Sequence, residues 1–220
     1  MKTKVLGFFQ ENKWLIGFNL LGLYLLVKMA EDVIQEEYIL IIDRWISIHI
    51  NALQTPLVSQ FMVSLTSVNG AQGTLIISFV LMLWLAYKKY FLDLWFYFLC
   101  VGGAAIAFSL IKVMVQRTRP ISDIINVTGY SFPSGHATMA TTVALSVYII
   151  FSKRVHLTGL RILLLFACVA WALAIAFSRI YLDVHWVSDV IAGLGLGLFW
   201  VTLIVLCKNM LVYMGLINLR

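Results

Sequence analysis

The stretch LWFYFLCVGGAAIAFSLI, Leu94 to Ile111, contains no charged residue and lies between Asp93 and Lys112. A helix of about 20 apolar residues crosses the roughly 30 Å hydrocarbon core of a bilayer. The strands of a membrane β-barrel would instead alternate apolar and polar residues, and this stretch does not. The sequence therefore predicts a transmembrane helix here.

Five other runs also lack Asp, Glu, Lys and Arg. With the first stretch they give six predicted spans, at residues 14–27, 71–87, 94–111, 137–152, 162–178 and 190–207. The composition agrees, because 62% of the residues are hydrophobic and only 12% are charged, against about 25% charged in soluble domains. We predict an all-α integral membrane bundle of six transmembrane helices. No shift in composition marks a second domain, so residues 1–220 are expected to form one.

The segment between the first two predicted spans is apolar but interrupted by charges. Residues 31–65 include Glu36, Glu37, Asp43, Arg44 and Pro56. This pattern predicts one or more interfacial helices along the outer membrane surface. Two interpretations stay open: the segment shapes a lateral opening for lipid, or it caps the bundle.

The orientation of the chain is predicted from the basic residues near the span ends. If the N-terminus is cytoplasmic, the inner side receives ten of the 16 basic residues, which are Lys2, Lys4, Lys13, Lys88, Lys89, Lys153, Arg154, Arg161, Lys208 and Arg220. Of the 10 acidic residues, only Glu11 and Asp93 then lie inside. We predict a multi-pass protein of the plasma membrane with both termini cytoplasmic, and a first span that is retained.

Polar residues gather at the outer ends of the last four predicted spans, and the first group is KVMVQRTRP, Lys112 to Pro120. In a helix that continues to Pro120, Lys112 and Arg119 share a face and Arg117 points elsewhere. Two cations on one face favour an anion such as phosphate. The alternative, interfacial anchors that snorkel outward, is weakened because the outer side should be poor in Lys and Arg.

The second group is PSGH, Pro133 to His136. Ser134 is expected to cap a helix, which leaves the backbone N–H groups around Gly135 free for an anion. His136 is a candidate proton donor to a leaving oxygen. Taken alone, this motif is more typical of an ordinary capped helix.

The third group is SRIYLDVHWVSD, Ser178 to Asp189. On a helix, His185 and Asp189 would share a face, so that Asp189 orients the imidazole and the other ring nitrogen can attack. Arg179 is predicted on the turn between spans, within reach of a phosphate. A structural hydrogen bond between His185 and Asp189 remains the alternative.

Three further charged residues near these motifs have no motif role. Exposed salt bridges are the default expectation for Asp123, Asp183 and Arg117, and the alternative is that they tune the site or contact a lipid head group.

Together, the three groups resemble the type 2 phosphatidic acid phosphatase superfamily of membrane lipid phosphatases. That family carries Lys-x6-Arg-Pro, Pro-Ser-Gly-His and Ser-Arg-x5-His-x3-Asp, matched here by Lys112, Arg119, Pro120, Pro133, Ser134, Gly135, His136, Ser178, Arg179, His185 and Asp189. The matched motifs extend from residue 112 to residue 189, and no position departs from them.

The resemblance implies a mechanism without metal or cofactor. His185 is the expected nucleophile, Asp189 its orienting group, and His136 the proton donor. The expected phosphate ligands are Lys112, Arg119, Ser134, Gly135 and Arg179.

The resemblance also implies a lipid phosphate or diphosphate substrate at the extracytoplasmic face. The chain is similar to the phosphatidylglycerophosphate phosphatase B group and to undecaprenyl diphosphate phosphatases. No nucleic acid and no obligatory protein partner are expected. A phosphatidate-type phosphatase of broad specificity, or a transporter or binding protein with an anion site, remains an alternative.

Overall fold

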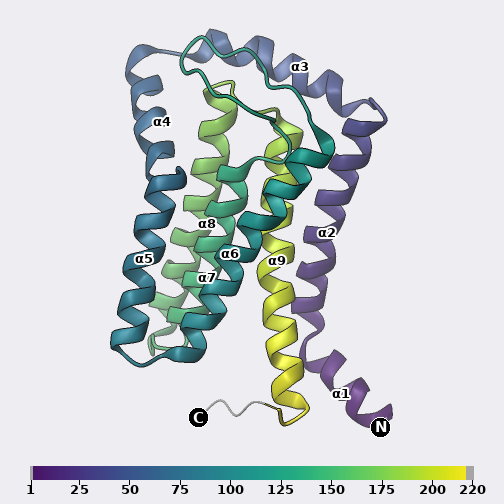
Figure 1. Cartoon of the computed structure of the whole chain (residues 1–220), viewed down its shortest axis with the longest axis vertical. Helices are drawn as coiled ribbons and strands as arrows, with labels where there is room; N and C mark the ends of the chain where they lie inside the picture. The colour runs from purple at the N-terminus through teal and green to yellow at the C-terminus, as the bar shows by residue number, and fades with distance from the viewer. Residues whose placement is uncertain (1, 217–220) are drawn as a thin grey trace.

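The computed structural model describes residues 2–216, and over this range the chain is helical with no strand (Figure 1). The elements are α1 (Lys2–Glu11), α2 (Lys13–Ile34), α3 (Ile39–Ile50), the 3-10 helix η1 (Asn51–Leu53), α4 (Pro56–Val68), α5 (Ala71–Tyr87), α6 (Phe91–Val115), α7 (Gly135–Ser152), α8 (Thr158–Tyr181) and α9 (Val187–Tyr213).

Five helices are long and apolar enough to cross a membrane, namely α2, α6, α7, α8 and α9. The sixth candidate span is broken: α4 and α5 pass the same test together but meet at an angle of 45°. The predicted six-span bundle is confirmed in this form. Residues 71–87, predicted as a whole span, make up its second half.

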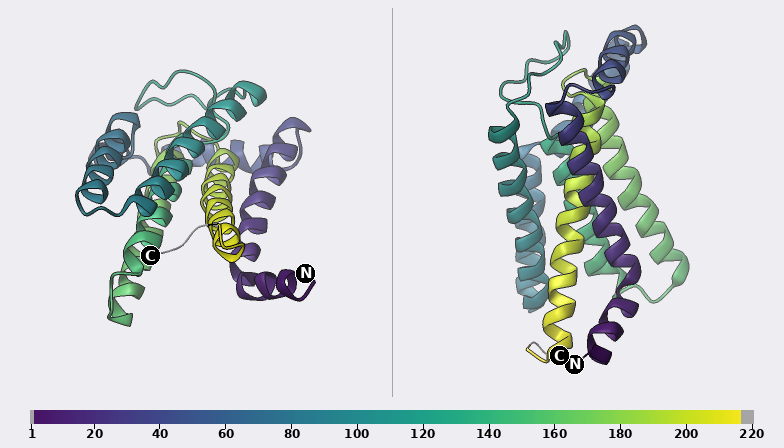
Figure 2. Two further views of the ribbon diagram at one scale, coloured as in Figure 1. Left: turned by 60° about the horizontal axis from the view of Figure 1, so that its bottom comes forward. Right: turned by 90° about the vertical axis from the view of Figure 1, so that its right-hand side faces the viewer.

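Glycine allows the central helices to approach closely. A Cβ atom on Gly22 of α2 would lie 2.6 Å from the backbone nitrogen of Phe199 and 2.8 Å from the carbonyl oxygen of Gly195, both on α9. On another face of α9, a Cβ atom on Gly193 would lie 2.6 Å from the carbonyl oxygen of Ser134. Small residues permit such backbone contacts between membrane helices. Figure 2 shows α2 running along α9.

The segment that follows α2 divides into two parts. Helix α3 lies across one end of the bundle, as expected for an outer surface helix (Figure 1). The prediction was wrong for residues 56–65, because α4 turns into the bundle, where it packs against α8. Pro56 begins α4, a position where proline costs the helix no hydrogen bond.

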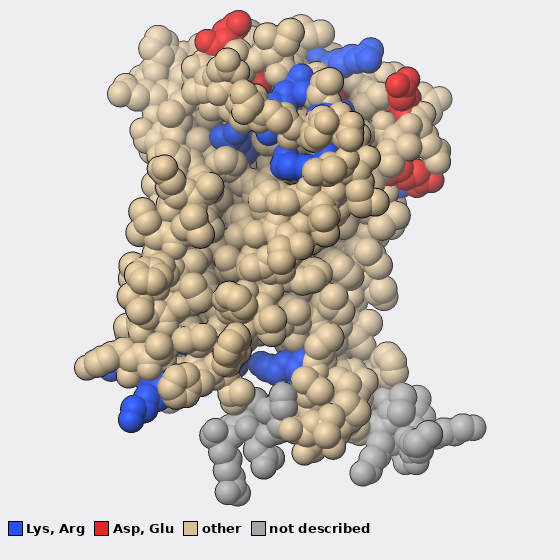
Figure 3. Space-filling model, viewed as in Figure 1, with Lys and Arg blue, Asp and Glu red and all other residues tan. Residues whose placement is uncertain are grey.

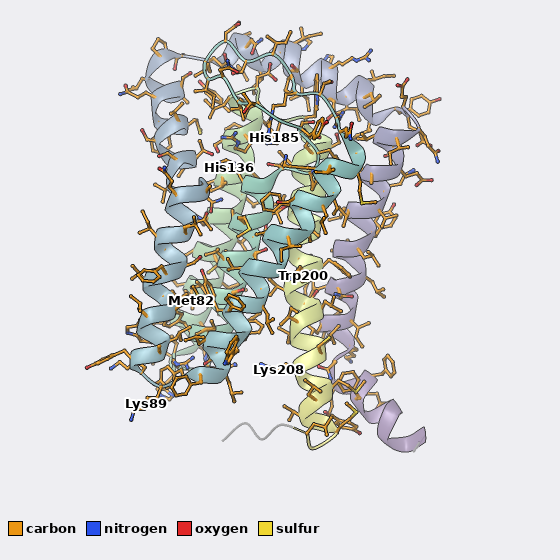
Figure 4. All side chains as sticks on the ribbon, viewed as in Figure 1. Met82, Lys89, His136, His185, Trp200 and Lys208 are labelled. Carbon is orange, nitrogen blue, oxygen red and sulfur yellow. The ribbon has the colours of Figure 1, made fainter. Side chains whose placement is uncertain are left out.

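Charged side chains separate between the two ends of the molecule. All acidic side chains visible in Figure 3 lie at the α3 end, while basic side chains lie at both ends. Lys89 and Lys208 are at the end opposite to His136 and His185 (Figure 4). Arg220, which the sequence assigns to the inner side, lies outside the described residues. The side of the membrane that each end faces remains a prediction.

Candidate active site

The three motifs meet around one cavity at the α3 end of the bundle. The cavity has a volume of about 610 Å³ and its lining includes Lys112, Arg119, Gly135, His136, Arg179 and His185. Figure 4 shows His136 and His185 near one another at this end. The structure thus brings together candidate residues from α6, α7, α8 and the segments that connect them.

His185 lies in the turn between α8 and α9 and is only 3% exposed. Its Nε2 atom is 3.0 Å from Nη1 of Arg119, and its Nδ1 atom is 3.3 Å from Oδ2 of Asp189. A guanidinium group can only donate, so Nε2 accepts and Nδ1 carries the proton that faces Asp189. Burial and the nearby cations Arg119, Arg179 and Lys112 hold the pKa of His185 well below its ordinary value. This favours the neutral ring, whose Nε2 lone pair is directed at Arg119, another residue of the cavity lining.

The contact between His185 and Asp189 arises differently from the prediction. Helix α9 begins at Val187, so His185 precedes the helix and does not share a helical face with Asp189. Asp189 instead lies in the first turn and accepts a hydrogen bond from the backbone N–H of Trp186 at 3.0 Å. This capping contact holds the carboxylate beside the turn that carries His185.

The two cations of the first motif also meet by a different route. Helix α6 ends at Val115, and Gln116 follows in the left-handed region with φ of 51°. The predicted helix through Arg119 is therefore wrong, and Arg119 lies in the irregular segment 116–134 that connects α6 to α7. Both cations line the cavity, and both donate to the carbonyl oxygen of Tyr130, Lys112 at 2.6 Å and Arg119 at 3.0 Å.

Arg179 was predicted on a turn but lies in the last turn of α8. Its side chain is almost fully buried and donates from Nη1 to Oγ1 of Thr66 at 3.0 Å. The Nε atom has no hydrogen-bond partner among the described residues. A buried guanidinium with an unused donor, in the lining of a cavity, is suited to an anionic ligand.

Helix α7 begins at the cavity, as the second motif predicted. Ser134 is its N-cap, with Oγ 3.5 Å from the backbone nitrogen of Ala137, and its own N–H donates to the carbonyl oxygen of Asp189 at 2.9 Å. The first helical residues, Gly135 and His136, line the cavity. Free N–H groups and the helix dipole make this end favourable for an anion.

The structure differs from the exposed salt bridges expected for Arg117 and Asp183, and it adds Asp43, which was not predicted at the site. Arg117 does not form an exposed salt bridge, because it binds the buried carboxylates of Asp43 and Asp189. Asp183 is also buried and accepts a hydrogen bond from Ser47. The signal for Asp43 was present, since an acidic residue inside the apolar run ILIIDRWISI needs a partner when it is buried.

The curated proteins that match part of the chain include an undecaprenyl-diphosphatase and a phosphatidylglycerophosphatase. An undecaprenyl-diphosphatase of Sulfolobus acidocaldarius is 37% identical over 70 residues, which are 32% of this chain and 30% of that protein. Phosphatidylglycerophosphatase B of Bacillus subtilis is 31% identical over 91 residues, which are 40% of this chain and 45% of that protein. Each match spans less than half of the relative.

Two crystal structures share the fold. The first transmembrane PAP2 type phosphatidylglycerolphosphate phosphatase from Bacillus subtilis matches with a TM-score of 0.77 at 21% identity, over 94% of this chain and 98% of that chain. LpxE of Aquifex aeolicus matches with a TM-score of 0.60 at 20% identity, over 74% of this chain and 94% of that chain. The fold is thus that of membrane-embedded PAP2 proteins.

A family model covers more than half of the sequence. The model of the PAP2 superfamily matches residues 93–213, which contain all three motifs and the cavity residues from α6 to α9. The chain therefore belongs to the PAP2 superfamily.

Proposed function

We propose that this protein is a membrane phosphatase that hydrolyses a lipid phosphate or lipid diphosphate through a phosphohistidine intermediate. The observation that carries the proposal is the neutral, buried His185, oriented by Asp189 and facing a cavity with three cationic side chains. A neutral imidazole with a fixed tautomer is a nucleophile, and the cations offset the charge of a phosphoryl group.

In the proposed first step, Nη1 of Arg119 turns from Nε2 of His185 to a phosphoryl oxygen, Nε2 attacks phosphorus, and the bond from phosphorus to the lipid oxygen breaks. His136 gives its proton to that oxygen as it departs. Asp189 stabilises the positive charge that develops on His185. The phosphoryl oxygens are bound by Lys112, Arg119, Arg179 and the N-terminal end of α7 at Gly135. Ser134, expected as a further phosphate ligand, is fully buried and caps this helix end instead.

In the proposed second step, water attacks phosphorus and the bond from phosphorus to Nε2 breaks. His136 accepts the proton of the water, which restores the protonation state that it had before transfer. Inorganic phosphate then leaves the site. These residues supply the steps without a metal ion.

The shape of the cavity supports a lipid substrate. From His185 the cavity continues as a channel between α5 and α6 as far as Met82 and Phe98. The lining of this channel is mainly apolar. Figure 4 places Met82 far from the two histidines along the length of the bundle. An apolar channel that opens beside a cationic site fits an amphiphile with a phosphate head and a hydrocarbon chain.

The names of the relatives suggest the substrate class. They point to undecaprenyl diphosphate and phosphatidylglycerophosphate, and we propose that this chain acts on one or both. We also propose that the site faces the extracytoplasmic side, because the opposite end carries most of the basic residues assigned from the sequence. A carrier lipid diphosphate on that leaflet fits this orientation.

The direct test compares wild-type protein with His185→Ala in detergent and lipid micelles. Both are given undecaprenyl diphosphate, phosphatidylglycerophosphate and phosphatidate in buffer with a metal chelator, and released phosphate is measured. We expect the wild type to release phosphate, to yield an acid-labile phosphoprotein on rapid quenching, and to be inhibited by vanadate. His185→Ala should release no phosphate and form no phosphoprotein. Full activity of His185→Ala would refute the mechanism. Uptake of lipid phosphate into vesicles without phosphate release would show a transporter instead.

A further inference from the structure

Helix α3 places a carboxylate directly behind the proposed catalytic pair. Asp43 is 2% exposed although it belongs to a surface helix. Its Oδ1 atom accepts the backbone N–H of Ser188 at 3.0 Å, and its Oδ2 atom accepts the Ser188 hydroxyl at 2.5 Å. Ser188 is the residue before Asp189, so Asp43 holds the first turn of α9 at the site.

Arg117 joins this carboxylate to the one that orients His185. Its Nη2 atom donates to Asp43 at 2.8 Å, and its Nη1 atom donates to Oδ1 of Asp189 at 2.7 Å and to the Ser188 hydroxyl at 2.6 Å. The guanidinium also lies over the ring of Trp186, with its central carbon 5.4 Å from the ring centroid. The side chains of Asp43 and Asp189 are 1% and 0% exposed, so the contacts are shielded from water.

The two oxygens of Asp189 therefore have separate partners. Oδ1 faces Arg117, while Oδ2 faces Nδ1 of His185 and the N–H of Trp186. A planar guanidinium fixes the plane of a carboxylate more strictly than a point charge does. Arg117 also separates two buried carboxylates that would otherwise repel each other.

We infer that Asp43 and Arg117 are positioning residues, which hold Asp189 and thereby aim His185 at the phosphoryl group. Neither residue belongs to the three motifs, and Asp43 lies outside the stretch that the family model matches. The inference rests on the proposed function, because it concerns the aim of the proposed nucleophile. It makes α3 a part of the catalytic unit as well as a cover for the bundle.

The first test is Asp43→Asn, which keeps the size of the side chain and an oxygen for Ser188 but removes the charge. Arg117 is then balanced by Asp189 alone, which weakens the hold of Asp189 on His185. We expect kcat and the rate of phosphoenzyme formation to fall by about 10²-fold, the order of loss for a small displacement of a reacting group. KM should stay unchanged, because Asp43 contacts none of the phosphate ligands.

The second test is a double-mutant cycle on the same lipid phosphate. If Asp43 acts through Arg117, the variant with both Asp43→Asn and Arg117→Gln should be no slower than the slower single variant. Losses that multiply would mean that the two residues act separately, and would overturn the inference. So would an unchanged kcat in Asp43→Asn, or a fall in kcat/KM that comes from KM alone.

The control is Asp93→Asn, which breaks a salt bridge of similar kind at the other end of the molecule, where Asp93 lies 2.5 Å from Arg154. We expect this variant to keep the wild-type kcat. If Asp43→Asn does not elute as a folded species from size-exclusion chromatography, Ser188→Ala takes its place, with both charges kept and a smaller fall in kcat expected. Failure of the proposed function is seen separately, as wild-type protein that releases no phosphate.

Discussion

The chemistry of single residues at this site depends on an excess of positive charge around one imidazole. Lys112, Arg119 and Arg179 line the cavity, whereas Asp189 is the carboxylate that contacts His185 within residues 2–216, and its other oxygen is bound to Arg117. An anion placed among these cations would balance them. The same cations, together with burial, lower the pKa of His185, so a single arrangement would serve both the proposed binding of phosphate and the proposed attack by His185.

The depressed pKa of His185 predicts how activity varies with pH. The ring must be neutral to attack. As the pH is lowered, kcat/KM should therefore begin to fall only below about pH 6.5, the ordinary pKa of histidine. In Arg119→Gln a cation 3.0 Å from Nε2 is lost, which raises the pKa of His185. The acidic limb of the profile should therefore move to higher pH. A pH series of kcat/KM tests this, with Lys89→Gln as the control, and an unmoved limb in Arg119→Gln would contradict it.

At the scale of the helices, two glycines of α2 give a matched pair for packing. A Cβ atom on Gly22 would lie 2.6 Å from a backbone atom of α9, whereas one on Gly17 meets nothing within 4 Å. We expect Gly22→Ala to separate α2 from α9 and to destabilise the bundle by about 1–3 kcal/mol, as overpacking does. Gly17→Ala should be neutral or slightly stabilising. Thermal unfolding in detergent measures both, and equal midpoints would show that the close contact contributes nothing.

The channel between α5 and α6 offers a second test at this scale. Gly102 lines the cavity, and a Cβ atom there meets nothing within 4 Å, so a larger side chain can project into the space. We expect Gly102→Phe to raise KM for a long-chain lipid phosphate and to leave a short, water-soluble phosphate ester unaffected. Gly17→Phe, on an exposed face of α2, is the control. An equal change for both substrates would mean that the channel does not hold the chain.

Charge-free runs predicted the spans because every backbone N–H and C=O group inside lipid needs a hydrogen-bond partner within the protein. A helix provides these partners within a single segment. Helix ends were harder to predict. Nothing in KVMVQRTRP marks the end of α6 at Val115. The residue that ends a helix in the left-handed conformation is usually glycine, but here it is Gln116. The bent span was missed because apolar residues in α4 match an interfacial helix as well as half of a broken one.

Across the whole molecule, the N-terminal segments complete the part of the site that the sequence motifs describe. Asp43, Thr66 and Asn69 contact Ser188, Arg179 and the backbone of His136, respectively. The residues in these pairs are between 67 and 145 positions apart in the chain. A single sequence carries no local pattern for such pairs, so the motifs predicted the cavity residues and the support of His185 by Asp189, but not the support that comes from α3 and α4.

The orientation of the molecule in the membrane gives the last prediction. Ile121 is 88% exposed in the segment over the cavity, and Lys88 follows α5 at the opposite end. In a Cys207→Ser background, where Cys100 and Cys168 are buried, we expect a membrane-impermeant maleimide to label Ile121→Cys on intact cells. Lys88→Cys should be labelled only after the membrane is permeabilised.

The reverse pattern would place the proposed phosphatase site on the cytoplasmic side. That outcome would change which lipids can reach the site. A carrier lipid diphosphate left on the outer leaflet would then be out of reach, whereas a phospholipid phosphate on the inner leaflet would be accessible. The chemistry around His185 would stand, because its geometry does not depend on orientation. Labelling therefore separates the choice of substrate from the mechanism, which an assay in micelles cannot do because it removes the two faces.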